Sequence, residues 1–211
     1  FGACSHVPEQ LGVDAAGELS GKALKSCVTD PRLPVRIAAM DAYFGTVYPH
    51  ERQCSEAVEL PGGTPTEKAE FRDNLIADIA KVEQGMKIAL IGGVNPLIAA
   101  IRKRGGTCLP CDLQMERTHW GDPVEKDMEK VLDSADGVIC TGMTLSSGTF
   151  DRVIERVLER SIPLTVYAQT GSAVAARFVG AGITSLVAEP FPFSQFSANA
   201  TRVFCYRGQG D

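Results

Sequence analysis

Three segments of the sequence combine glycine with hydroxyl side chains, and they are the residues best suited to bind a small molecule. They are IGGVNP at 91–96, TGMTLSSGTF at 141–150 and AQTGSAV at 168–174. Hydroxyl groups and free backbone N–H groups at the start of helices bind phosphate and carboxylate oxygens. The segments therefore predict a site for a small anionic molecule. The alternative is structural, because strand-to-helix connections favour glycine for the turn and a hydroxyl for the helix cap.

An acidic residue after the first segment extends this predicted site. Asp112 lies about twenty residues beyond the glycine pair, at the end of the next expected strand, where a dinucleotide-binding protein holds the ribose. IGGVNP lacks the full G-x-G-x-x-G pattern, so a nucleotide is the less favoured cofactor. The candidate ligand-binding residues are Gly92, Gly93, Asn95, Asp112, Thr141, Gly142, Thr144, Ser147, Thr149, Gln169, Thr170, Gly171 and Ser172.

A second group of residues is suited to bind a transition metal. Cys108 and Cys111 form a C-x-x-C pair, and His119 follows in the next expected loop. Thiolate and imidazole groups are ligands of zinc, copper and nickel. The alternative is a pair of buried strand cysteines, because thiols at this spacing in a strand project to opposite faces unless Pro110 bends the chain. The cofactor stays open, with a transition metal favoured over a nucleotide.

Four residues are candidates for an acid, a base or a nucleophile, namely Asp41, Cys111, His119 and Asp151. The sequence has no recognisable Ser-His-Asp triad, Walker loop, H-E-x-x-H motif or paired-carboxylate signature. No reaction follows from spacing alone, and whether the protein is an enzyme stays open.

Aromatic residues gather in AEPFPFSQF at 188–196, where prolines separate three phenylalanines. This pattern suits neither a regular helix nor a central strand. The segment is expected either to line the crevice, with Ser194 or Gln195 reaching the ligand, or to form a hydrophobic strap or homodimer contact. Trp120, beside His119, is a further candidate for the pocket wall.

Composition excludes several classes of partner. Of the 211 residues, 44% are hydrophobic and 22% are charged, as in an ordinary globular protein, and the net charge is -5. No block of like charges offers a footprint for nucleic acid. No apolar run is long enough for a membrane span, and the first residues lack a signal-peptide pattern. The sequence thus predicts a cytoplasmic protein, without nucleic-acid or membrane partners, whose seven cysteines are reduced.

The elements that must position these residues alternate regularly after residue 86, where β-rich apolar runs are separated by amphipathic runs of helix length. Strands are expected at 87–92, 106–112, 137–142, 163–169 and 183–189, and helices at 96–105, 123–135, 148–161 and 172–182. The predicted fold class is α/β, an open Rossmann-like and mostly parallel sheet with helices on both faces. Its ligand crevice lies at the carboxyl ends of the strands.

The first third of the chain is expected to form a small N-terminal α+β region. Helices are predicted from residue 17 to 27, from 34 to 44 and from 66 to 85, and the proline- and glycine-rich stretch from 48 to 66 is predicted to connect two domains. The expected domains are residues 1–60, a small and possibly truncated unit, and residues 66–211, the Rossmann-like ligand-binding unit.

Three longer stretches of the chain resemble the DUF364 family, which is described as a heavy-metal chelation family. They are KIALIGGVNPLIAAI, SADGVICTGMTLSSGTFDRVI and VYAQTGSAVAARFVGAGIT, of which Asp136–Thr149 is the most specific part. Residues 17–45 also resemble the end of the DUF4213-type small domain of that family, which has an enolase-N-terminal-like fold. The resemblance implies a Rossmann-like domain whose crevice faces the smaller domain.

The chain departs from the family pattern at several positions. Ser147 stands where the family usually has Asn, and Asp41 and Ala42 stand where it usually has Asn and Ala. The resemblance and the loops together lead us to expect a metal-handling or metallophore-related protein that binds a small anionic molecule or a metal chelate between its two domains. The alternative is a biosynthetic enzyme that uses the same loops to bind a nucleotide or a small carboxylate or phosphate substrate.

Overall fold

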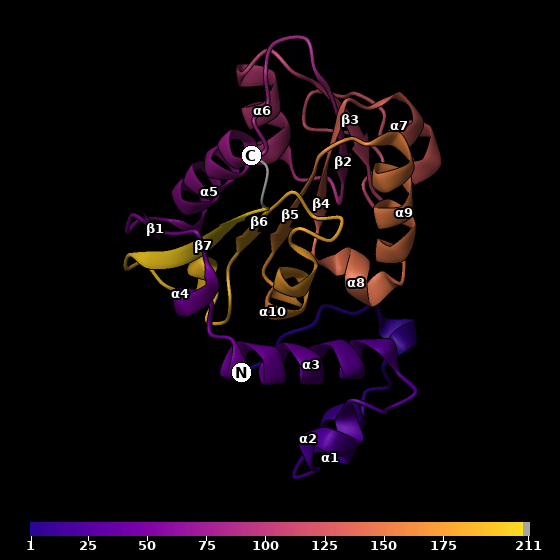
Figure 1. Ribbon diagram of the computed structural model, residues 1–211, viewed down its shortest axis with the longest axis vertical. Coiled ribbons are helices and arrows are strands. Elements are labelled where there is room, and N and C mark those ends of the chain that lie inside the picture. The colour runs from indigo at the N-terminus through magenta and orange to yellow at the C-terminus, as the bar shows by residue number, and fades with distance from the viewer. Residues whose placement is uncertain (209–211) are drawn as a thin grey trace.

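The computed structural model describes residues 1–208, and its centre is a mixed sheet of seven strands (Figure 1). The order across the sheet is β1-β7-β6-β5-β4-β2-β3. Strands β2 to β6 are parallel to one another, whereas β7 pairs antiparallel with both β6 and β1. The strands are β1 (Glu56–Leu60), β2 (Lys87–Ile91), β3 (Thr107–Cys111), β4 (Gly137–Thr141), β5 (Leu164–Ala168), β6 (Ser185–Ala188) and β7 (Thr201–Arg207).

Short and medium-length helices connect these strands. The α-helices are α1 (Ala15–Leu19), α2 (Leu24–Cys27), α3 (Leu33–Val47), α4 (His50–Gln53), α5 (Pro65–Ile79), α6 (Asn95–Lys103), α7 (Met128–Ser134), α8 (Met143–Ser147), α9 (Phe150–Arg160) and α10 (Ser172–Ala175). The 3₁₀ helices are η1 (Pro8–Gln10), η2 (Ala176–Phe178) and η3 (Ser194–Phe196). Among the helices of residues 1–208, none has the length and apolar character that crossing a membrane requires.

The sheet has a hydrophobic core on each face, because alternate residues of a strand point to opposite sides. Ile88 and Leu90 of β2 pack with α5 and α6, whereas Ala89 and Ile91 pack with α3, α7, α9 and α10. Each of the larger side chains, Ile88, Leu90 and Ile91, contributes about 1.5–3 kcal/mol when it is fully buried. The predicted α/β class with helices on both faces is confirmed.

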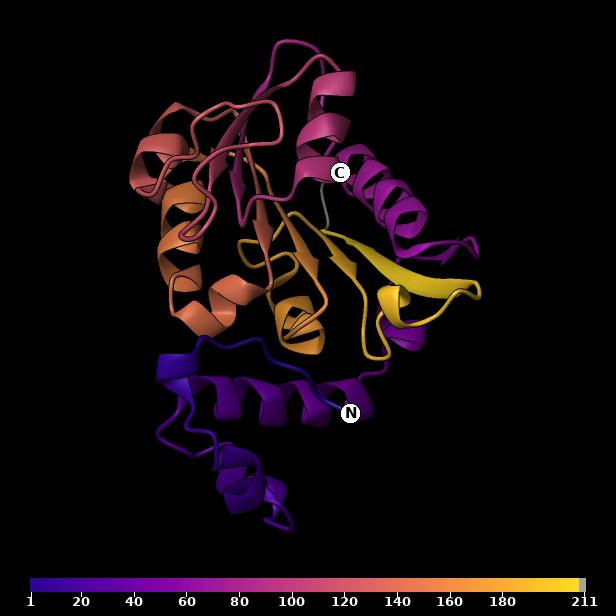
Figure 2. The same cartoon turned by 180° about the vertical axis from the view of Figure 1, so that it is seen from behind.

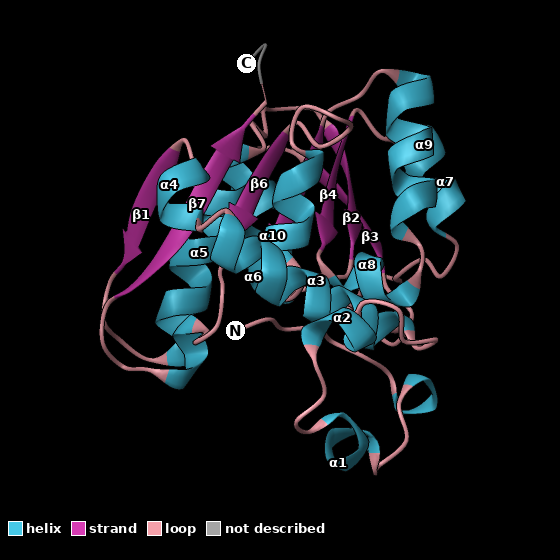
Figure 3. Cartoon of the chain, turned by 60° about the horizontal axis from the view of Figure 1, so that its bottom comes forward, coloured by secondary structure: helices cyan, strands magenta, loops and turns pink. Residues whose placement is uncertain are grey.

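The parallel strands taken alone run β3-β2-β4-β5-β6, which is the flavodoxin-like order of a doubly wound sheet. From β2 the chain adds β3 on one side and then returns to add β4 on the other side, so the strand order reverses between β2 and β4. Ligands of such sheets bind at this switch point, beyond the carboxyl ends of the strands. Helix α3 packs against α8 and α10 across this end of the sheet (Figure 3). The N-terminal segment runs between α3 and the sheet (Figure 2).

The first 53 residues contain helices and turns but no strand. The first strand of the described chain, β1, joins the common sheet through β7. The strand content expected of a separate N-terminal α+β unit is therefore found in the main sheet. The domain division at residues 60–66 stays a prediction.

Two strands were not predicted, and both lie in the antiparallel edge. β1 occupies the stretch that we expected to be a connection. Its EAVEL sequence has only five residues and does not alternate regularly between charged and apolar positions. β7 contains the VFCY run and lies beyond the last strand that we predicted, which ends at residue 189. A short edge strand gives a weaker pattern than the apolar parallel strands.

The predicted helices differ from the structure mainly at their ends. Residues 17–27 form two short helices, α1 and α2, instead of one. The helix predicted from 66 to 85 ends at Ile79, and α7 begins at Met128, where the Asp127 side chain accepts a hydrogen bond from Glu129 N. The helix predicted from 172 to 182 is α10 followed by η2, which ends at Phe178.

Candidate functional site

The switch point between β2 and β4 is built around Gly92. Its φ is +87°, a left-handed conformation that favours glycine, and a Cβ at this position would collide with the Thr141 side chain at the end of β4. The Tyr167 hydroxyl of β5 donates a hydrogen bond of 2.5 Å to the Gly92 carbonyl. These contacts hold the ends of three strands together at one side of the site.

Asp112 follows β3 and shapes the adjoining loop. Its Oδ2 accepts a hydrogen bond of 3.1 Å from Gly93 N, and its Oδ1 accepts bonds of 2.8 Å each from Gln114 N and Met115 N. A carboxylate that accepts three backbone N–H groups has little capacity left for a ribose hydroxyl. The geometry thus gives Asp112 a loop-positioning role at the cavity.

The opposite wall contains an arginine that the sequence analysis did not select. Arg72 of α5 donates from Nη1 to Glu189 Oε2 at 3.3 Å, and Gln169 Nε2 donates to the same oxygen at 3.0 Å. Glu189 Oε1 accepts a hydrogen bond from Ser194 N, and Gln169 Nε2 also donates to Gln195 Oε1 at 2.7 Å. The Glu189 carboxylate is therefore compensated on both oxygens.

Behind this wall lies a second carboxyl group, Asp73, which is 1% exposed. Its Oδ1 accepts a hydrogen bond of 3.0 Å from Arg72 Nε. Burial raises the pKa of Asp73, and the charge of Glu189 raises it further, although Arg72 opposes both effects. Burial likewise raises the pKa of Tyr167, so that its hydroxyl remains a donor.

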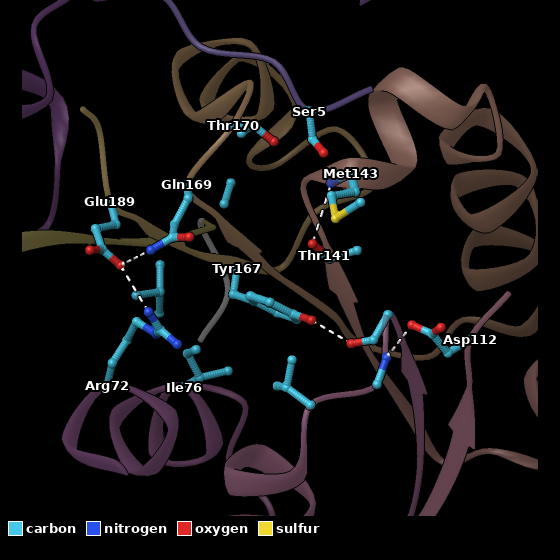
Figure 4. A pocket seen from close by; sticks show the side chains of 15 residues that line it. Ser5, Arg72, Ile76, Asp112, Thr141, Met143, Tyr167, Gln169, Thr170 and Glu189 are labelled. Carbon is cyan, nitrogen blue, oxygen red and sulfur yellow. Dashed lines mark hydrogen bonds and ion pairs between the residues drawn. The ribbon is translucent and has the colours of Figure 1, made fainter. Parts of the chain in front are cut away.

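Between these two walls lies a cavity of about 280 Å³ (Figure 4). Arg72, Glu189 and Gln169 lie at one side, Asp112 at the other, and the Tyr167 ring lies between them. The volume lies just below the range of about 300–1,000 Å³ that small-molecule sites occupy, so the cavity suits a small ligand. The lining residues are Ser5, Arg72, Ile76, Gly92, Gly93, Val94, Asp112, Thr141, Met143, Tyr167, Ala168, Gln169, Thr170, Val187 and Glu189.

The structure places about half of the candidate ligand-binding residues at this cavity. Those that line it are Gly92, Gly93, Asp112, Thr141, Gln169 and Thr170. Those that do not are Asn95, Gly142, Thr144, Ser147, Thr149, Gly171 and Ser172. Asn95 instead accepts a hydrogen bond of 2.8 Å from His119 N, which ties the start of α6 to the loop after β3.

Hydroxyl groups of the second loop bond within the loop. Thr144 Oγ1 donates to Thr141 O at 2.7 Å, Ser146 Oγ donates to Met143 O at 2.9 Å, and Ser147 Oγ lies 2.9 Å from Thr149 Oγ1. Thr144 is buried, and Ser147 is exposed but does not line the cavity. The TGMTLSSGT sequence thus stabilises the short helix α8, which matches the structural alternative for this loop.

The Ser172 hydroxyl and backbone groups of the third loop bond to buried side chains beneath α10. His50 Nε2 lies 3.2 Å from Ser172 Oγ, and His50 Nδ1 lies 2.5 Å from the Tyr206 hydroxyl. Asp41 of α3 accepts hydrogen bonds from Ala3 N at 2.9 Å and Ala173 N at 2.7 Å, and burial raises its pKa. Asp41, His50 and Ser172 are buried and absent from the cavity lining, and Gly171 N donates to Ala3 O at 2.8 Å.

The cysteine pair and His119 are not brought together. Cys108 packs in the core beneath α5 and α6, whereas Cys111 packs in the core on the opposite face of the sheet. Burial raises the pKa of Cys108 to about 12 and that of Cys111 to about 11, which disfavours the thiolate that binds metal. Within residues 1–208, no three His, Cys, Asp or Glu side chains converge in a way that could hold a metal ion.

The remaining candidates lie on the surface away from the cavity. His119 is exposed and makes an edge contact with the Trp120 ring, which in turn lies 4.8 Å from the Arg102 guanidinium. Asp151 is exposed in the first turn of α9. Neither His119, Trp120 nor Asp151 lines the cavity.

Arg72 and Glu189 were missed because their local patterns are ordinary. Arg72 lies in a helix with many charged residues, and Glu189 directly follows a buried strand. One signal was available for Glu189, because an acidic residue at the carboxyl end of a parallel strand lies at the ligand edge of such a sheet. The position of Arg72 depends on how α5 packs, which no spacing in the sequence encodes.

Fold and cavity together define a doubly wound α/β protein with a ligand-sized cavity at its switch point. The model of the family DUF364, described as "Putative heavy-metal chelation", matches residues 74–185, which is more than half of the 211 residues. The chain belongs to the DUF364 family. The resemblance proposed from the sequence is thereby confirmed.

Two crystal structures of DUF364 proteins of unknown function share this fold. The protein from Desulfitobacterium hafniense DCB-2 is 15% identical, with a TM-score of 0.62 over 97% of this chain and 80% of that chain. The protein from Pyrococcus horikoshii is 13% identical, with a TM-score of 0.65 over 98% of this chain and 83% of that chain. Among curated proteins, none matches this chain.

Proposed function

We propose that this protein binds a small carboxylate-bearing anion, free or as its metal chelate, in the cavity between Arg72 and Asp112. The observation that carries the proposal is the guanidinium of Arg72 in the cavity wall. Its Nε and Nη1 are engaged by Asp73 and Glu189, whereas its Nη2 has no hydrogen-bond acceptor among residues 1–208. A guanidinium with a free edge is the preferred protein partner of a carboxylate.

Other groups at the cavity support a ligand of this kind. The acidic residues Asp112 and Glu189 each accept three hydrogen bonds from the protein, so their charge is partly offset before a ligand arrives. Thr141 and Thr170 add hydroxyl groups. Ile76, Val94 and Val187 form an apolar floor that suits the carbon frame of a small organic molecule.

The family description supports the chelate form of the ligand. Because no protein ligand set for a metal converges within residues 1–208, the donor atoms around an ion would come from the organic molecule itself. The protein would then recognise the carboxylates of the chelator, and its part in metal handling would be to carry or present the chelate.

Native mass spectrometry and elemental analysis of the purified protein test this proposal first. We expect a bound organic anion, and metal in equal amount if the chelate is the ligand. A bound nucleotide would instead favour the biosynthetic enzyme.

Direct binding supplies the second test, with L-tartrate as the probe. Arg72→Gln is expected to lower tartrate affinity by about tenfold or more, the effect of losing a charged hydrogen bond. Arg104→Gln is the matched control, because the Arg104 side chain is equally exposed at 18% and pairs with Asp78 away from the cavity. Equal tartrate affinity of wild type and Arg72→Gln would contradict the proposal.

A further inference from the structure

Asp73 is the buried carboxyl group next to the cavity that the proposed function does not use. Its side chain is 2% exposed, and its Oδ2 is buried without a hydrogen-bond partner among residues 1–208. A buried ionised oxygen without a partner is strongly destabilising, whereas a protonated carboxyl group avoids most of that cost. The geometry alone therefore favours the neutral acid.

Charge counting around Arg72 leads to the same conclusion. Two carboxyl groups, Asp73 and Glu189, contact the single guanidinium of Arg72. If both were ionised, this buried group would carry a net charge of −1. Among residues 1–208, Glu189 accepts three hydrogen bonds and Asp73 accepts one, so the proton resides on Asp73.

The other charged and titratable groups around Asp73 do not offset that charge. Glu189, which follows β6, repels an ionised Asp73, and Tyr167 of β5 stays protonated. Lys68, on the same helix, donates to Ser194 O at 3.3 Å, Ser197 O at 2.9 Å and Asn199 O at 2.5 Å. Arg72 is thus the cation on which both carboxyl groups depend.

We propose that Asp73 carries a proton in the ligand-free protein and that this proton makes the cavity selective for anions. With Asp73 neutral, the charges of Arg72 and Glu189 cancel, and Arg72 Nη2 is available to a carboxylate. When Asp73 ionises, the wall becomes negative and repels the same ligand. Asp73 acts through Arg72 without touching the ligand, so it is a specificity-determining and positioning residue.

The protonation of Asp73 can be tested without any ligand, by NMR of protein labelled with ¹³C at the aspartate carboxyl carbons. We expect one resonance to remain in the protonated position at about pH 6, well above the ordinary aspartate pKa of about 3.9. This resonance is absent from Asp73→Asn and present in Asp78→Asn, a control on the exposed side of the same helix. Titration of Asp73 near its ordinary pKa would overturn the proposal.

Asp41 is a second buried aspartate whose pKa is raised, so its resonance is assigned with Asp41→Asn. If Asp73→Asn does not fold, the Asp41→Asn protein still tests whether Asp73 is protonated. In that background a protonated aspartate resonance at about pH 6 supports the proposal, and its absence rejects it.

The selectivity for anions rests on the proposed function and is tested with L-tartrate, whose carboxylates remain ionised above about pH 5. Wild-type affinity is expected to fall about fivefold to tenfold as Asp73 ionises with rising pH, because a like charge then faces the ligand. Asp73→Asn is expected to keep its affinity across the same range. Parallel pH profiles of the two proteins would overturn the inference, whereas a protonated Asp73 without tartrate binding would reject only the proposed function.

Discussion

Two polar clusters lie at the same end of the sheet, and only one of them opens into the cavity. The cluster of Arg72, Glu189 and Gln169 forms a cavity wall, and Arg72 keeps a free N–H edge there. The cluster of His50, Ser172 and Tyr206 is sealed, with each side chain at most 5% exposed. Of the predicted binding residues, Gln169 borders the cavity, whereas Ser172 is in the sealed cluster.

The difference shows that the hydroxyl groups of loops at a sheet edge have two possible roles, packing and ligand binding. Where a helix packs over the loop, as α3 does over α10, the hydroxyl groups satisfy buried partners and specify packing. Where the loop faces open space, as at Thr141 and Thr170, the same groups are available to a ligand. Packing of the neighbouring helix decides between these roles.

The largest loss of stability is expected from a change at Lys68, which donates hydrogen bonds to backbone carbonyls of residues 194–199 beside the cavity wall. Lys68→Met leaves three backbone carbonyls without their donor, and each loss costs about 1–3 kcal/mol when the oxygen stays buried. We expect the free energy of unfolding in urea to fall by about 3 kcal/mol. Lys103→Met, an exposed change on α6, is the control, and a comparable effect of both changes would contradict the assignment.

The sealed cluster is expected to give the protein a pH-dependent stability. Burial lowers the pKa of His50 from 6.5 to about 4, so the unfolded chain takes up a proton at a higher pH than the folded one. The free energy of unfolding should therefore fall as pH drops from about 6.5 to about 4, by on the order of 3 kcal/mol. His50→Gln should flatten this slope, whereas His6→Gln, at an exposed position, should leave it intact.

A smaller effect is expected from a methyl group at the cavity wall. Gly92 and Gly85 share a φ of +87°, but a Cβ at Gly92 would collide with Thr141, and a Cβ at Gly85 would meet nothing within 4 Å. Gly85→Ala measures the backbone strain alone, about 1 kcal/mol. Gly92→Ala should cost about 1 kcal/mol more in thermal unfolding and should also weaken tartrate binding. Equal losses of stability for Gly92→Ala and Gly85→Ala would contradict this prediction, because they would show that the Thr141 side chain moves aside without cost.

The smallest effect is expected from Thr144, whose hydroxyl bonds within the second loop. Thr144→Val removes the bond from Thr144 Oγ1 to Thr141 O and should cost about 1 kcal/mol of stability. Because Thr144 does not line the cavity, tartrate affinity measured by calorimetry should stay within about twofold. A large loss of affinity in Thr144→Val would instead place this loop in the site.

The parallel part of the fold follows from the sequence because its strands are continuous apolar runs, such as KIALI and GVICT. The location of the site can also be predicted from the sequence, because the carboxyl ends of parallel strands meet at one edge of the sheet. Gly92, Asp112, Thr141 and Gln169 were found in this way.

The rest depends on contacts between segments far apart in the chain. Arg72 meets Glu189 across more than half of the sequence, and both residues lie outside the stretch from 74 to 185 that carries the family match. Likewise, the burial of Ser172 is caused by α3 and by His50, which precede it by over a hundred residues. Local spacing carries no signal for such pairs.

The position of β7 has a consequence for how the chain is made. β7 lies between β6 and β1, so β1 reaches the sheet only through a strand that ends at Arg207. During synthesis, the segment up to residue 60 therefore leaves the ribosome long before its partner strand exists, and β1 stays unpaired until the chain has been made through Arg207.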